Sequence, residues 1–312
     1  MSEQWAFVFP GQGSQKTGMG AALASNFAAA RRIFDAADEA LGESLSTLCF
    51  EGPDEQLALT ANTQPAILTC SVAAWTVVHE ELGLAPTVCL GHSLGEFSAL
   101  VAAGALDFAD AVRLVRLRGQ AMQDAVPAGV GAMAAIVGLE PAKVEAMCAD
   151  LSGPDAQVGV ANENGGGQLV VAGHSAAVHR LVAEVKAIRG KAILLNVSAP
   201  FHCGLMRPAA ERLAAALEQV HVHPLQVPVI ANVDAEVNRD ATRVKDLLVR
   251  QITGRVRWEA SVRNAVHMGV TRFIELGHGK VLAGLIKRIA ADVPVVPVGS
   301  PADIDVLKVE AT

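Results

Sequence analysis

The sequence predicts an α/β fold: a parallel sheet with helices around it, and a smaller inserted unit. Short apolar runs that end in glycine-containing loops, at Trp5–Pro10 and Thr87–Gly91, alternate with helical patterns. This alternation is typical of a parallel sheet. The rhythm changes after Val126 and returns after Val197, which marks the insert. With 312 residues, 51% of them hydrophobic, the chain can bury a large core.

The first part of the chain carries two strands and four helices. The two apolar runs are predicted to be buried strands because they are short and bounded by glycine and proline. Apolar periodicity predicts helices over 19–40, 64–81, 94–103 and 107–126. The uncharged stretch Gln56–Val78 carries Asn62, Gln64 and Pro65. These residues favour a packed helix over a membrane span.

Residues 128–197 form the predicted small domain. Its strands are expected at Met133–Val137, Val158–Ala161, Leu169–Ala172 and Ala192–Val197, and its helices at Pro141–Asp150 and Ser175–Ile188. The order β-α-β-β-α-β is the ferredoxin-like pattern. The large domain is therefore discontinuous and comprises 1–127 and 198–312.

The α/β pattern resumes after the insert. We expect helices over 206–219, 243–251, 258–268 and 280–291, and strands at Pro228–Asn232, Arg272–Leu276 and Val293–Val298.

Composition excludes several classes of protein. A net charge of −7 without a basic run argues against nucleic-acid binding. The five cysteines form no CxxC pair, and the N-terminus has no signal-peptide pattern. We therefore expect a reduced, cytoplasmic protein that does not enter a membrane.

The segment Gly91-His92-Ser93-Leu94-Gly95 follows a predicted strand and precedes a predicted helix. This is the pattern of a nucleophile elbow, where glycines permit a tight turn and the serine projects at a helix N-terminus. The alternative is a glycine-rich turn with a capping serine. His92 is better explained by packing than as the base, because neighbours in a tight turn point apart.

A catalytic serine needs a base, and His202 is the best candidate among nine histidines. It lies in "NVSAPFHCGLM", between the last strand of the insert and a helix, with Pro200 and Phe201 before it. A loop histidine with a satisfied hydrogen bond is the alternative. No carboxylate occupies an obvious triad position, which indicates that another group orients the ring.

Arg118 lies on the apolar side of its predicted helix, where Leu114, Val115, Ala121 and Met122 are its neighbours. A guanidinium in an apolar stripe needs an anion. Either an internal Asp or Glu meets it, or a carboxylate arrives with the substrate.

The loop "FPGQGSQKTGMG" does not match a dinucleotide-binding motif, because Lys16 occupies the third glycine position. The loop can instead supply backbone N–H groups near the serine. Gln12 and Leu94 are candidate donors to an oxyanion, although a plain strand-to-helix turn is an equal explanation for Gln12.

Taken together, these motifs resemble the malonyl-CoA:acyl carrier protein transacylase family, which is related to the acyltransferase domains of polyketide synthases. The resemblance covers about residues 4–300. The segments that carry it include "FVFPGQGSQ", "TQPAI", "GHSLGEFSAL", "RLRGQAMQ", "ANENGGGQLVVAG", "SAPFHCGLM" and "ELGHGKVL".

The resemblance implies a large α/β-hydrolase-like domain with a ferredoxin-like insert and an active site between them. It makes Ser93 the nucleophile, His202 the base and Arg118 the partner of the malonyl carboxylate. The amides of Gln12 and Leu94 would form the oxyanion hole. The backbone carbonyl of Gln251 would hold the histidine.

The implied reaction is a ping-pong transfer of malonyl from malonyl-CoA to the phosphopantetheine thiol of acyl carrier protein, for fatty-acid synthesis. It needs no metal and no tightly bound cofactor, since coenzyme A enters as a thioester substrate. We expect a monomer. The alternatives are an acyltransferase serving a polyketide synthase, a serine thioesterase or esterase, and a non-enzymatic carrier-binding subunit.

Overall fold

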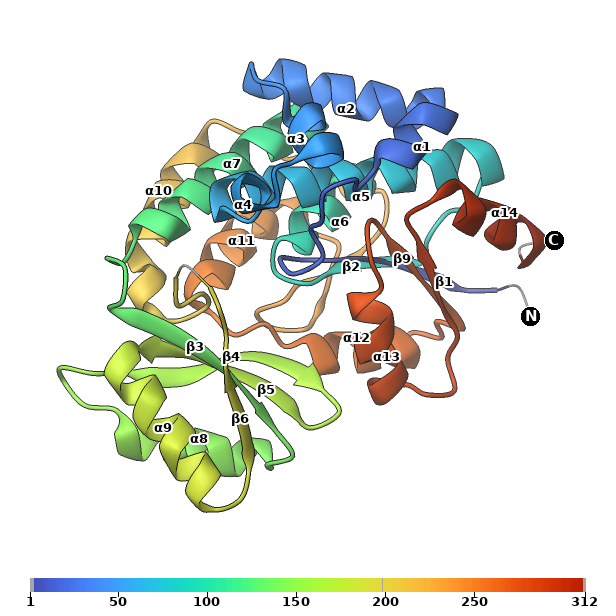
Figure 1. Ribbon diagram of the computed structural model, residues 1–312. Coiled ribbons are helices and arrows are strands. Elements are labelled where there is room, and N and C mark those ends of the chain that lie inside the picture. The colour runs from blue at the N-terminus through green and yellow to red at the C-terminus, as the bar shows by residue number, and fades with distance from the viewer. Residues whose placement is uncertain (1–2, 198, 311–312) are drawn as a thin grey trace.

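The computed structural model describes residues 3–197 and 199–310. The boundary residue Ser198 of the predicted large domain, and the first two and last two residues of the chain, lie outside the described residues. The described chain forms an α/β structure with one large and one small sheet, and the small sheet lies to one side of the large one (Figure 1).

The large sheet has six strands in the order β10-β9-β1-β2-β7-β8. Their bounds are β1 (Trp5–Phe9), β2 (Val88–Gly91), β7 (Val229–Ile230), β8 (Val237–Asn238), β9 (Arg272–Leu276) and β10 (Val295–Val298). All neighbouring pairs are parallel except β7 and β8. Side chains of β1 alternate between two cores: Phe7 and Phe9 enter one, while Ala6 and Val8 enter the other. The predicted parallel sheet is confirmed.

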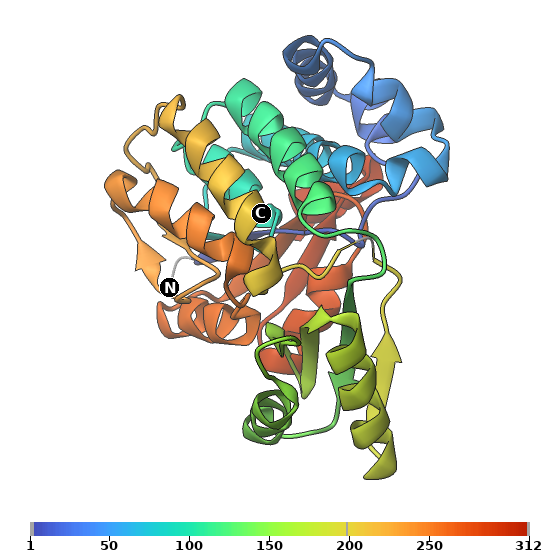
Figure 2. The ribbon, with the colours of Figure 1, turned by 90° about the vertical axis from the view of Figure 1, so that its left-hand side faces the viewer.

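Helices cover both faces of this sheet (Figures 1 and 2). The core that receives Phe7 and Phe9 contains residues from α1 (Ala21–Asn26), α2 (Ala28–Leu41), α3 (Leu45–Glu51), α4 (Asp54–Leu57), α5 (Thr60–Leu82), α6 (Gly95–Ala102), α7 (Phe108–Asp124), α10 (Arg207–Glu218), α11 (Val244–Thr253) and α14 (Pro301–Glu310). The other core is closed by α12 (Trp258–His267) and α13 (Val281–Ile289).

The small sheet is antiparallel, with the order β4-β5-β3-β6. Its elements are β3 (Gly131–Val137), α8 (Pro141–Leu151), β4 (Val158–Gly165), β5 (Gln168–His174), α9 (Ser175–Ala187) and β6 (Lys191–Leu194). Helices α8 and α9 pack on one face, as Figure 2 shows. Met133 and Val170 point from the other face toward the large sheet and belong to its core. The small sheet therefore leaves one face available to form a cleft.

Backbone hydrogen bonds tie β4 to the segment that follows α11. Glu163 N–H donates to the Val256 carbonyl at 2.9 Å, and Val256 N–H donates to the Ala161 carbonyl at 2.8 Å. The tip of the β4–β5 hairpin packs on α13, where a Cβ added to Gly165 would lie 2.3 Å from Ile289 Cγ1. These contacts fix the small sheet against the large one.

Some predicted elements differ from the observed ones. The helix expected over 19–40 is two helices, because Phe27 between them is extended. The helix expected from residue 64 begins at Thr60, and Pro65 lies inside it. Its first turn is held by the Thr63 hydroxyl, which donates to the carbonyls of Leu57 and Leu59. These local hydrogen bonds close the turn that precedes Pro65, so the helix begins before the proline.

Other differences concern short or terminal elements. The strand expected at Ala192–Val197 ends at Leu194, and the following residues leave the sheet toward the cleft. Helices α3, α4 and α14, strand β8, and the short 3₁₀ turns Gly204–Met206 and Ala241–Arg243 were not predicted. Among the described helices, none is both long and apolar enough to cross a membrane.

Candidate active site

The elbow sequence forms a strained turn between β2 and α6. Ser93 has a φ of 52°, in the left-handed region that L-residues rarely adopt. A Cβ on Gly91 would lie 1.9 Å from Gly95 C, and one on Gly95 would lie 2.0 Å from the Phe9 carbonyl oxygen. Both glycines are therefore required by close backbone approaches. The turn presents the Ser93 hydroxyl beside the N-terminus of α6.

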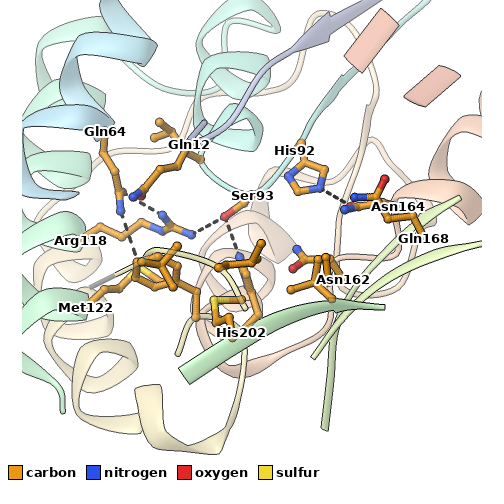
Figure 3. Close-up of a pocket in the computed structure, with 17 residues that line it drawn as sticks. Gln12, Gln64, His92, Ser93, Arg118, Met122, Asn162, Asn164, Gln168 and His202 are labelled. Atoms are coloured by element: carbon orange, nitrogen blue, oxygen red, sulfur yellow. Dashed lines mark hydrogen bonds between the residues drawn. The ribbon is translucent and has the colours of Figure 1, made fainter. Parts of the chain in front are cut away.

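The structure brings Ser93 and His202 into direct contact (Figure 3). Ser93 Oγ lies 2.7 Å from His202 Nε2, and His202 Nδ1 lies 2.9 Å from the Gln251 carbonyl oxygen. A carbonyl can only accept, so Nδ1 carries the proton and Nε2 presents a lone pair to the hydroxyl. The histidine is thus oriented to take the serine proton without a carboxylate partner.

Arg118, from α7, reaches the same hydroxyl and is only 2% exposed. Its guanidinium donates to Ser93 Oγ at 3.1 Å, Gln64 Oε1 at 2.8 Å and Gln251 Oε1 at 2.9 Å. In the described part of the chain Arg118 forms no ion pair within 4 Å. The direct partners are neutral, so the internal ion pair considered from the sequence is not formed. The buried cation can accept an arriving carboxylate.

Gln12 and Leu94 line the cleft together with Ser93. Leu94 is the residue before α6, and the Gln12 side chain donates to Thr60 Oγ1 at 3.3 Å. Within residues 3–197 and 199–310, neither backbone N–H has a hydrogen-bond acceptor. Two amides beside a candidate nucleophile are a suitable arrangement for stabilising an oxyanion.

A cleft of about 240 Å³ lies between the two sheets and contains all these groups except Gln251. One end holds Arg118, Gln64 and Gln12, and the other holds His92 near Asn164 (Figure 3). Met122 of α7 also lines the cleft, and the small sheet and the segment after it supply the rest, which is Met133, Ala135, Asn162, Gln168, Val170, Leu195, Val197 and Phe201. The cleft can therefore hold an elongated molecule with an anionic end.

His92 points away from the serine hydroxyl, as the tight turn predicts. Its Nε2 lies 2.9 Å from Asn164 Oδ1, and its ring packs at a tilt on Trp258. Burial lowers the pKa of His92. It is a packing residue of the cleft wall rather than the base.

Sequence reasoning missed three polar residues that hold the site. Asn232 follows β7; its Oδ1 accepts from Ser93 N–H at 2.7 Å and its Nδ2 donates to the Gly91 carbonyl at 2.6 Å. Glu96 accepts from Asn232 N–H, and Gln64 binds Arg118. Asn232 had a detectable signal, because a polar residue at the carboxyl end of a strand lies at the edge where parallel sheets place their sites.

Burial sets the protonation states of the site. It lowers the pKa of His202 to about 3, and the charge of Arg118 acts in the same direction. Burial also lowers the pKa of Arg118 to about 10, while Glu96 opposes that change. At neutral pH the imidazole is therefore neutral, with a lone pair that can accept a proton, and the guanidinium is charged and can bind an anion.

The chain is similar in sequence to a known protein family. Residues 6–299 match the family model described as acyl transferase domain. The malonyl CoA-acyl carrier protein transacylase of Salmonella typhimurium is 47% identical over 300 residues, covering 96% of this chain and 97% of that protein. The corresponding protein of Bacillus subtilis is 46% identical over 302 residues, with 96% and 95% covered.

Solved structures agree with this match. An acyl carrier protein S-malonyltransferase from Vibrio cholerae has a TM-score of 0.95 and 47% identity, covering 98% of this chain and all of that one (100%). A malonyl-transacylase solved in complex with a type II PKS acyl-carrier protein has a TM-score of 0.95 and 43% identity, covering 99% and 100%.

The elbow geometry makes a prediction about Gly95. Gly95→Ala places a methyl group against the Phe9 carbonyl, so β1 or α6 must shift. We expect a loss of about 1–3 kcal/mol in the free energy of unfolding, measured by urea denaturation. Gly153→Ala is the control, because a Cβ there meets nothing within 4 Å. Equal stability of the two variants would contradict the steric argument.

Proposed function

The chain belongs to the acyl transferase domain family, among the malonyl CoA-acyl carrier protein transacylases, and we propose that it performs malonyl transfer through Ser93. It would move the malonyl group of malonyl-CoA to the phosphopantetheine thiol of acyl carrier protein, for fatty-acid synthesis. The proposed roles of these residues rest on one observation: the hydroxyl oxygen of Ser93 contacts both His202 and Arg118.

In the first half-reaction, Ser93 Oγ attacks the thioester carbonyl while His202 Nε2 takes its proton. The N–H groups of Gln12 and Leu94 stabilise the oxyanion of the tetrahedral intermediate. The carbon–sulfur bond breaks, and the coenzyme A thiolate leaves with the proton from His202. The products are coenzyme A and a malonyl ester of Ser93.

The second half-reaction reverses these steps with a different thiol. The phosphopantetheine thiol gives its proton to His202 and attacks the ester, and the serine oxygen recovers the proton. Arg118 pairs with the free carboxylate of the malonyl group throughout. The scheme uses no metal and no tightly bound cofactor, because every step is a proton or acyl transfer between groups already named.

The arrangement of the fold supports further proposals. The parallel sheet with its elbow supports an α/β-hydrolase-like domain over 1–127 and 198–312, and the order of the small sheet supports a ferredoxin-like domain over 128–197. The five cysteines are free, which favours a cytoplasmic location. We also propose a monomer, because both residues of the serine–histidine pair come from one chain.

An alternative acceptor has one observation in its favour. The structural neighbour in complex with a type II PKS acyl-carrier protein is as similar in fold as the others. A carrier protein of polyketide synthesis would use the same thiol chemistry. Transfer from the malonyl-enzyme to purified carrier proteins of both kinds distinguishes the two acceptors.

The covalent intermediate is the most direct test of this function. Incubation with malonyl-CoA alone should add the mass of one malonyl group to the wild-type protein, measured by intact mass spectrometry. Ser93→Ala should remain unmodified. Rapid release of free malonate without a detectable ester would favour a thioesterase. An unmodified wild-type protein would contradict the proposal.

Arg118 is predicted to set the preference for a diacid. Arg118→Ala should lower kcat/KM for malonyl transfer at least about 30-fold more than for acetyl transfer, because a buried charge pair is lost only with malonyl. Arg113→Ala is the matched control, since that exposed arginine of α7 binds Asp110 and the Ala40 carbonyl. Equal losses for both acyl groups would refute the carboxylate clamp.

The lowered pKa of His202 predicts that the reactivity of Ser93 changes little when the pH is lowered. A base with the ordinary pKa of about 6.5 loses most of its activity by pH 5.5. Here the imidazole stays neutral, so reaction of Ser93 with uncharged phenylmethylsulfonyl fluoride should change less than about twofold between pH 8 and pH 5.5. Circular dichroism verifies the fold at each pH, and His202→Gln gives the background rate. A midpoint near pH 6.5 would contradict the assignment.

A further inference from the structure

Glu96 carries a buried carboxylate beside the active site that the mechanism leaves unused. Glu96 is the second residue of α6 and is 2% exposed. Its Oε2 accepts from Asn232 N–H at 3.0 Å and from Gln251 Nε2 at 2.8 Å. Burying a charged carboxylate costs free energy, so a buried carboxylate is expected to serve either the fold or the site.

Its partner Gln251 connects every reacting group. The backbone carbonyl of Gln251 orients His202, and its Oε1 accepts from Arg118. Its Nε2 donates both to Glu96 and to the Ser93 carbonyl at 2.9 Å. Because Glu96 and the Ser93 carbonyl can only accept there, the amide nitrogen must face them and the amide oxygen must face Arg118.

The charges of Glu96 and Arg118 are separated by this one amide. Each shifts the pKa of the other toward its charged form, yet they form no direct ion pair within the described residues. A direct pair would occupy the guanidinium and compete with a substrate carboxylate. With no anion at all, the buried cation would be uncompensated.

On the premise of the proposed malonyl transfer, we propose that Glu96 is a positioning and selectivity residue acting through Gln251. Its carboxylate fixes the Gln251 amide between Arg118 and His202, and it balances Arg118 without occupying it. The same negative charge repels an arriving malonyl carboxylate. Glu96 therefore limits how tightly the diacid is held and leaves acetyl, which has no charge, unaffected by this repulsion.

Glu96→Gln removes the negative charge of the side chain and keeps its shape. One oxygen of Glu96 accepts both hydrogen bonds, so the amide oxygen of glutamine can replace it. We expect the ratio of kcat/KM for malonyl to that for acetyl to rise about tenfold at pH 8, as the repulsion across one amide is lost. A merely structural role would lower both rates and leave the ratio unchanged.

The effect of Glu96→Gln on the malonyl-to-acetyl ratio of kcat/KM should depend on pH in a defined direction. Burial raises the pKa of Glu96 to about 7, so the wild-type carboxyl is charged at pH 8 and largely neutral at pH 6. The charged groups that face it are Arg118 and Asp234, and His202 stays neutral across this range. The ratio should therefore differ between wild type and Glu96→Gln at pH 8 and converge at pH 6.

Two further variants complete the test. Glu96→Asp retains the charge but withdraws it from Gln251, so it should lower kcat for both acyl groups about tenfold without changing their ratio. Glu275→Gln is the matched control: Glu275 is 0% exposed, and its carboxylate accepts from the N–H groups of Leu282 and Ala283. It should leave the acyl-group ratio unchanged even where thermal stability falls.

The outcomes separate the two proposals. A wild-type protein that acquires no malonyl ester contradicts the function itself. If the wild type is acylated and Glu96→Gln shows the wild-type ratio at pH 8, the role of Glu96 is wrong. If Glu96→Gln does not fold by circular dichroism, the wild-type protein carries the test: its malonyl-to-acetyl ratio should rise between pH 8 and pH 6 as Glu96 becomes neutral, and a ratio that stays constant overturns the selectivity role.

Discussion

The burial of the Arg118 guanidinium is the constraint on which the rest of the site depends. A cation removed from water needs hydrogen-bond acceptors, and three side-chain oxygens provide them. These come from α5, from the elbow and from α11, so three segments distant in sequence must converge on one group. Every direct acceptor is neutral, and the buried Nε of Arg118 has no hydrogen-bond partner among the described residues, so the guanidinium is only partly satisfied and lacks a formal counter-charge at contact distance there.

The strained turn at Ser93 is maintained by the same network. A left-handed conformation at a serine costs free energy and persists only where surrounding contacts over-determine it. Asn232 accepts from the Ser93 N–H, and Gln251 donates to the Ser93 carbonyl. The backbone of the nucleophile is therefore held on both sides by amide side chains. Both residues also donate to Glu96, Gln251 through its side chain and Asn232 through its backbone N–H, so the strain is distributed over a buried set of amides.

The sequence predicted the parts of the site that local pattern can carry. The elbow can be recognised in the sequence because two glycines, each required by a close backbone approach, lie within five residues. Arg118 can be recognised because it interrupts the apolar face of a helix. The partners Asn232 and Gln251 lie 139 and 158 residues from Ser93 in the chain, so no local pattern links them to it. The role of the Gln251 carbonyl was available only through the family resemblance.

In the fold, too, the features with a local sequence pattern were predicted and the others were not. Long periodic helices and the apolar strands of the large sheet were predicted, since their burial leaves a period in the sequence. The break at Phe27 and the early start of α5 were not predicted: Phe27 adopts an extended backbone, and the first turn of α5 depends on hydrogen bonds from the Thr63 hydroxyl to the carbonyls of Leu57 and Leu59. Strand β4 extends four residues beyond its predicted end at Ala161, and three of those four are polar, so the apolar pattern used for the prediction stops before the strand does.

The link between the two sheets gives the base its orientation. The Gln251 carbonyl that fixes His202 lies near the end of α11, and Val256, five residues later, exchanges hydrogen bonds with β4. His202 itself follows the last strand of the small sheet. The small sheet thus reaches the imidazole by two routes, one through the chain and one through Val256.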